Sequence, residues 1–180
     1  ARIGAVSGVK GRHYDHPDTA ALPFSYLIEE AGKTVLLPGA NLKSIGLARD
    51  LRKWPERDRS SGIKHDHITF GGLTPYTIEK ILDGLRLLDN TDASADAVYK
   101  GVKIPARQIG RGRELYRMAI DLYLGEVVVK RINAGKELNS PDKPFREWQD
   151  LAGSIAPRAE IEHMLELLPA MHSVHELGTA

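Results

Sequence analysis

The spacing of apolar residues changes near Gly71 and Gly72. Before these glycines, the chain is rich in glycine, proline and short runs of strand-forming residues, whereas apolar residues after them recur with the 3.6-residue period of a helix. In the first part the pattern predicts strands at 24–28, 34–37 and 67–70, a hairpin turn at 29–33, and a short helix from Leu42 to Trp54 that Pro55 ends.

The helical part has a clear start. Thr74 is a suitable N-cap, and Pro75 follows at the first helical position. An apolar stripe from Ile78 to Leu88 then indicates which face of this helix is buried. Further helices are predicted at 95–102, 107–132, 145–151 and 158–168. Because the run at 127–129 is β-branched, a strand at that point is left open.

These elements predict an α+β fold in which a small N-terminal β-hairpin or sheet layer precedes a mostly helical C-terminal two thirds. The length of 180 residues and the hydrophobic content of 42% fit a single domain, 1–180, with a strand-and-turn portion at 1–72 and a helical portion at 73–180. No apolar window is long enough to span a membrane, and the absence of cysteine fits a reducing compartment. We therefore expect a cytoplasmic protein with no membrane partner.

Positive charge is concentrated locally in a chain that is almost neutral overall. The sequence holds 25 Lys and Arg against 24 Asp and Glu, yet the segment 98–113 contains no acidic residue. Three helices around a turn at Ile104 and Pro105, with a cationic start to the last helix, would form a helix-turn-helix unit. Arginines there could reach phosphates or guanine edges of DNA or RNA. The candidate nucleic-acid-binding residues are Lys100, Lys103, Arg107, Arg111, Arg113 and Arg117.

Two other interpretations of these cations are open. They could pair with the acidic stretch at 89–96 or with the glutamate-rich C-terminal region, which would make them part of a solvated, structural surface. Alternatively, Gly110 and Gly112 could make 110–113 a flexible loop that binds an anion, because glycine lets the backbone approach a phosphate closely.

Histidines and aspartates gather in two short segments of the strand-and-turn portion. Neutral imidazole and carboxylate suit Zn²⁺ or Fe²⁺, and a metal with an open position would activate water. The candidate metal ligands are His13, His16, His65 and His67, the candidate catalytic carboxylates are Asp15 and Asp66, and Asp18 is a further candidate ligand or base. The other interpretation is that both segments are polar surface loops.

The sequence therefore predicts one function and two alternatives. The leading hypothesis is a nucleic-acid-binding protein that acts as a homo-oligomer, since two copies add their weak contacts. The first alternative is a His/Asp metal-dependent enzyme, specifically a hydrolase with a Zn or Fe cofactor. The second alternative is a structural or assembly protein with neither activity.

Overall fold

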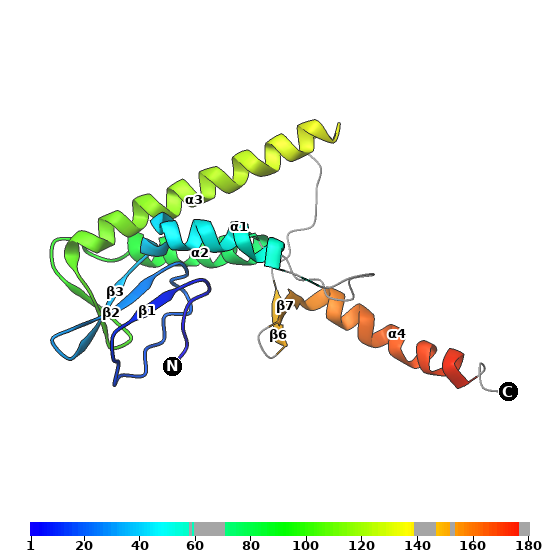
Figure 1. The fold of residues 1–180 in the computed structure, drawn as a ribbon, viewed down its shortest axis with the longest axis horizontal. Coiled ribbons are helices and arrows are strands. Elements are labelled where there is room, and N and C mark those ends of the chain that lie inside the picture. The colour runs from blue at the N-terminus through cyan, green and yellow to red at the C-terminus, as the bar shows by residue number, and fades with distance from the viewer. Residues whose placement is uncertain (58, 60–70, 139–146, 152–153, 177–180) are drawn as a thin grey trace. The chain divides into compact units, whose positions relative to one another are not determined.

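The computed structural model describes residues 1–57, 59, 71–138, 147–151 and 154–176. The chain divides into two compact units, Ala1–Leu138 and Asn139–Ala180. The first unit holds a β-sheet with helices, and the second holds a β-hairpin and a helix (Figure 1). The organisation as a single domain stays a prediction.

A sheet of five strands, counted among the described residues, forms the centre of the first unit in the order β1-β2-β3-β5-β4. β2 and β3 form the predicted antiparallel hairpin, with Leu27 opposite Leu36. β1 pairs with β2 in parallel, and β3 pairs with β5 in parallel, so the sheet joins segments from both sides of residues 71–72. The strands are β1 (Gly8–Lys10), β2 (Tyr26–Glu30), β3 (Lys33–Leu37), β4 (Ala97–Tyr99) and β5 (Val102–Ile104).

The described helices of the first unit are the 3-10 helix η1 (Ala40–Lys43), α1 (Ile45–Arg57), α2 (Pro75–Asp89) and α3 (Ala106–Asn133). α2 confirms its predicted start, since the Thr74 side chain accepts a hydrogen bond from the Thr77 backbone N–H. α1 starts later than predicted because η1 occupies the first residues, and Pro55 lies inside it. Pro55 lies in the last turn of α1, where proline removes only one backbone hydrogen bond, and the helix continues to Arg57. α3 confirms the long helix, and residues 127–129 are helical.

The helix predicted at 95–102 is wrong, because this segment forms the β4–β5 hairpin. Lys100 and Gly101 have φ values of 47° and 83°, which places two consecutive residues in the left-handed region. Two such residues form the tight turn whose twist matches that of paired strands. The burial of Val102 and Ile104, with Lys103 exposed between them, follows the two-residue period of a strand.

The second unit consists of β6 (Trp148–Leu151), β7 (Ser154–Pro157) and α4 (Arg158–Glu176), as far as it is described. The helix predicted at 145–151 is wrong in its described part, because β6 pairs with β7. A helix of seven residues makes few backbone hydrogen bonds, whereas strand pairing satisfies both segments. α4 confirms the last predicted helix and extends it, and the strand predicted at 67–70 lies outside the described residues. In the described residues, no helix has the length and apolar character needed to cross a membrane.

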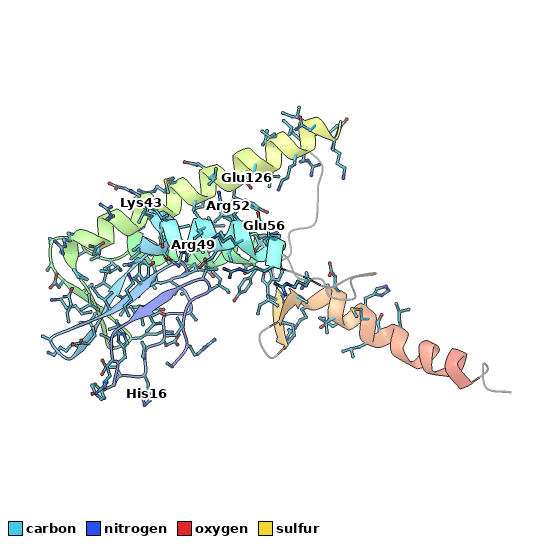
Figure 2. All side chains as sticks on the ribbon, in the orientation of Figure 1. His16, Lys43, Arg49, Arg52, Glu56 and Glu126 are labelled. Carbon is cyan, nitrogen blue, oxygen red and sulfur yellow. The ribbon has the colours of Figure 1, made fainter. Side chains whose placement is uncertain are left out.

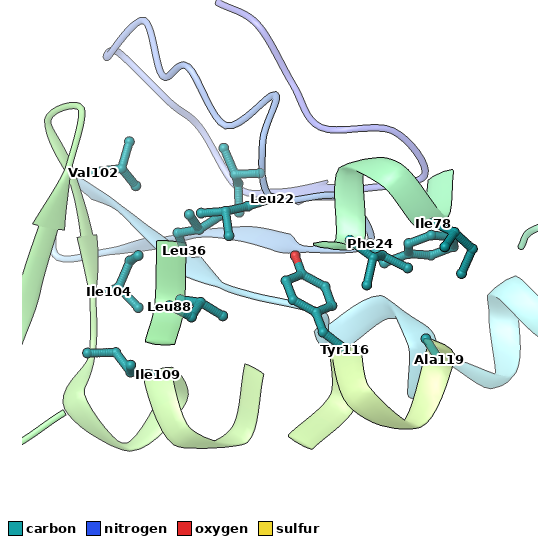
Figure 3. Packing of buried hydrophobic residues seen from close by; sticks show 12 residues of the cluster. Leu22, Phe24, Leu36, Ile78, Leu88, Val102, Ile104, Ile109, Tyr116 and Ala119 are labelled. Carbon is teal, nitrogen blue, oxygen red and sulfur yellow. The ribbon is translucent and has the colours of Figure 1, made fainter. Parts of the chain in front are cut away.

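The sheet and helices α2 and α3 enclose one hydrophobic core (Figure 3). Strand residues from β2, β3 and β5 meet helix residues from α2 and α3, together with side chains of the segment that precedes β2. The protein therefore has an α+β fold, as its apolar pattern predicts. The buried members of this core are Leu22, Phe24, Leu27, Leu36, Ile78, Ile81, Leu88, Val102, Ile104, Ile109, Tyr116 and Ala119.

Tyr116 is the largest fully buried side chain among the described residues. Its hydroxyl donates a hydrogen bond of 2.7 Å to the backbone carbonyl of Pro23, and this bond joins α3 to the chain just before β2. Burial raises the pKa of the Tyr116 hydroxyl above its ordinary value of 10.0, because the phenolate would lose its hydration. The folded protein therefore stabilises the neutral form.

We expect Tyr116→Phe to lower the free energy of unfolding by about 1–3 kcal/mol at pH 7, because the Pro23 carbonyl loses its donor. The raised pKa means that the hydroxyl contributes its full stability below pH 10 and loses it as the pH rises further. The gap between wild type and variant should thus narrow above pH 10. Urea titrations at several pH values measure both effects. Tyr123→Phe, which changes a half-buried residue, serves as the control; equal effects of both changes would contradict the assignment.

Candidate anion-binding site

An ion pair of Lys100 connects the tip of the β4–β5 hairpin to the N-terminal segment. Its ammonium group donates to the Asp18 carboxylate at 2.7 Å, and the same carboxylate accepts the Ala20 backbone N–H at 3.3 Å. The hydrogen bond from Lys100 is the main cause that lowers the pKa of Asp18. Asp18, a candidate metal ligand from the sequence, therefore has a structural partner.

Lys103 and Asp96 connect the hairpin to the start of α3. The Lys103 ammonium group lies 2.7 Å from the Asp96 carboxylate, which also accepts the backbone N–H of Ala106 at 2.9 Å. The hydrogen bond from Lys103 is the largest cause that lowers the pKa of Asp96, and the same bond raises the pKa of Lys103. Asp96 thus satisfies one free backbone donor at the N-terminus of α3.

Arg113 and Arg117 join α3 to the end of α2. The guanidinium group of Arg113 donates to the carbonyls of Leu88 and Thr91, with distances of 2.6 Å to each from Nη2. Arg117 pairs with Asp89 at 2.9 Å, and Arg113 lies 3.4 Å from the same carboxylate. The interpretation that cations pair with the 89–96 stretch is therefore confirmed for Lys103, Arg113 and Arg117.

Arg107 and Arg111 differ from the other four cations. Both are exposed on the first turns of α3, and neither has a hydrogen bond or an ion pair within the described part of the chain. They are four residues apart and so share one face of the helix. Two shallow depressions adjoin there: Arg107 and Gln108 line both, and Arg111 and Glu114 line the second.

The structure corrects the arrangement expected around these arginines. A helix-turn-helix unit needs a helix before the turn, and residues 97–104 form the β4–β5 hairpin instead. The flexible loop expected at 110–113 is also wrong, because these residues lie inside α3. Gly112 is required by close packing: a Cβ atom there would lie 2.9 Å from both Leu88 and Pro38 side-chain carbons.

The histidine candidates do not form a metal centre in the described residues. Both ring nitrogens of His13 already have partners, with Nδ1 2.9 Å from the Thr34 hydroxyl and Nε2 3.0 Å from the Lys10 carbonyl. Asp15 and His16 are exposed on the segment before β2, and Figure 2 labels His16. No group of three or more metal-ligating side chains occurs among the described residues. His65, Asp66 and His67 lie outside them, so the metal enzyme stays a prediction.

A family model described as a domain of unknown function, DUF4954, matches residues 1–92, which is just over half of the chain. The chain belongs to the DUF4954 family. The matched DUF4954 segment includes β1 to β3, α1 and α2, and it ends before β4, β5 and α3. The cations at 100–117 therefore lie beyond it, whereas His13 and His16 lie within it. No curated protein matches the chain, and no solved structure matches it.

The two glycines at the start of α3 give a matched pair of stability predictions for this DUF4954 chain. Gly112→Ala should lower the free energy of unfolding by about 1–3 kcal/mol, because its Cβ forces the contact with Leu88 and Pro38 apart. Gly110→Ala meets no described atom within 4 Å and should raise stability by up to about 1 kcal/mol through helix propensity. Thermal and urea unfolding measure both. Equal effects of the two variants would contradict the packing described.

Proposed function

We propose that this protein binds the phosphate backbone of nucleic acid through Arg107 and Arg111. The observation that carries the proposal is the division among the six candidate cations: four have partners in the protein, and these two have none in the described residues. The ion pairs of the other four give those cations a structural role. The two exposed arginines are left for an external anion.

The position of the arginines suits a phosphate. The guanidinium group presents a planar fork of N–H donors that fits phosphate oxygens, and two such groups one helical turn apart can bind neighbouring oxygens. Both lie in the first turns of α3, where the helix dipole favours negative charge. The Gln108 side chain lines the same depressions and adds a neutral hydrogen-bonding group.

Acidic residues limit the size of this site. Glu30 and Asp96 line the first depression, and Glu114 lines the second, so phosphates fit only beside the arginines. The site therefore offers two phosphate contacts, fewer than the six candidate cations of the sequence would allow. Binding by two exposed arginines is expected to be weak and independent of base sequence. The absence of cysteine from the chain supports a cytoplasmic setting for this activity.

The salt dependence of binding tests this proposal. Two phosphate contacts predict that log K falls against log salt with a slope of about −2 for duplex DNA. The double variant Arg107→Ala with Arg111→Ala should show no measurable affinity and therefore no salt dependence. Because both side chains are exposed, the unfolding curve of this variant should match that of the wild type. Fluorescence anisotropy with a labelled duplex, from low to moderate salt, measures both quantities.

A matched variant controls for net charge. Arg52→Ala with Lys136→Ala also removes two exposed cations, one from α1 and one beyond α3, and should leave the slope unchanged (Figure 2 labels Arg52). An equal loss in both double variants would show attraction by overall charge and would contradict the site. Absence of binding by the wild type at low salt would reject the proposal outright.

A further inference from the structure

The second half of α3 exposes a stripe of large apolar side chains. Their exposed fractions are 47% for Met118, 55% for Leu122, 55% for Val129 and 59% for Ile132. Together with Gly125 they follow each other at spacings of four, three, four and three residues, which keeps them on one face. We call Met118, Leu122, Gly125, Val129 and Ile132 the outer stripe.

The outer stripe lies opposite the face that α3 turns to its own core. Tyr116, Ala119 and Tyr123 lie on the core side of the helix, and successive residues are rotated by about 100°, so the stripe points away from them. A helix that is apolar on two opposite faces needs a packing partner on each face. The outer stripe has no such partner among the described residues. Figure 1 shows this half of α3 extending beyond the sheet.

A depression in the middle of the stripe marks where another helix can approach. It is lined by Asp121, Leu122, Gly125, Glu126, Val129 and Lys130 (Figure 2 labels Glu126). Gly125 has no side chain, and a Cβ atom there would meet no described atom within 4 Å. Glycine within an exposed helix lowers stability by about 1 kcal/mol relative to alanine. A glycine at this position would allow a second helix to approach α3 closely.

The stripe is nearly symmetrical about Gly125. Met118 and Ile132 lie seven residues from it in either direction, and Leu122 and Val129 lie three and four residues from it. A second helix with reversed direction therefore presents an apolar side chain at almost every position where the first presents one. This complementarity fits a second copy of the same helix in an antiparallel arrangement.

The charges on this half of α3 favour the same arrangement. Residues 118–125 carry one charge, on Asp121, whereas residues 126–133 carry Glu126, Lys130 and Arg131 and are net positive. Reversed copies place the negative part of one helix beside the positive part of the other and also oppose the two helix dipoles. Parallel copies would place like charges beside each other, with Asp121 near Glu126 of the second copy.

We propose that this protein forms a homodimer in which α3 of one copy crosses α3 of a second copy, antiparallel, at Gly125. Met118 then packs beside Ile132 of the second copy, and Leu122 packs beside Val129 of the second copy. The contact buries the outer stripe and leaves the Tyr116 side of each helix in its own core. The inference does not rest on nucleic-acid binding.

Sedimentation velocity over a concentration series tests the dimer with the full chain. A small apolar interface predicts a dissociation constant in the micromolar range. Leu122→Glu should weaken the dimer at least a hundredfold, because two charges would be buried at the crossing. Leu124→Glu is the matched control: Leu124 is 53% exposed but lies off the stripe, so its dimer should keep the wild-type dissociation constant. Circular dichroism verifies that both variants remain folded.

Disulfide cross-linking tests the direction of the helices, since the chain has no cysteine of its own. A mixture of Met118→Cys and Ile132→Cys proteins should form a disulfide-linked heterodimer on oxidation, and neither variant alone should cross-link. Self-linking of each single variant would indicate parallel helices and overturn the proposal. A chain that stays monomeric up to about 100 µM, or a dimer that loses no affinity with Leu122→Glu, would overturn it as well.

Discussion

The hydrogen bond from Tyr116 to the Pro23 carbonyl constrains much of the first unit. It places a polar group inside an apolar core, where an unpaired carbonyl would be costly, so helix and loop are held in one relative position. Gly84 lets α2 approach the same ring closely, since a Cβ atom there would lie 2.9 Å from Tyr116. The first half of α3 is therefore fixed against both α2 and the sheet. The face of α3 opposite Tyr116 is thereby turned away from the core.

α3 meets three different environments along its length. Its inner face packs in the core, its first turns present Arg107 and Arg111 to solvent, and its second half presents the outer stripe. Acidic residues on neighbouring segments pair with Lys100, Lys103, Arg113 and Arg117. The local positive charge that the sequence shows is mostly structural, and two arginines remain.

Sequence reasoning succeeds where local signals decide the structure, as for α2, whose cap at Thr74 and apolar stripe are both local. It fails at 97–104 because two strands of three residues carry almost no periodic signal, and the turn at Lys100 and Gly101 is recognisable only once its φ values are known. The pairing of β5 with β3 and of Lys100 with Asp18 joins residues far apart in the chain. Such contacts depend on the whole fold, which is why the sequence alone predicts an external ligand for four cations that have partners within the protein.

The two proposals constrain each other through the geometry of α3. Arg107 and Arg111 lie on the same face as the outer stripe, and α3 of the second copy would end at Asn133, about 9 Å short of Arg111 along the helix. With a rise of 1.5 Å per residue, the two arginine pairs of the dimer lie about 50 Å apart along the crossing helices. The two-fold axis also turns them in opposite directions. One straight duplex would therefore not contact both pairs in the proposed dimer, so the proposed dimer and the proposed phosphate contacts are separate properties of α3.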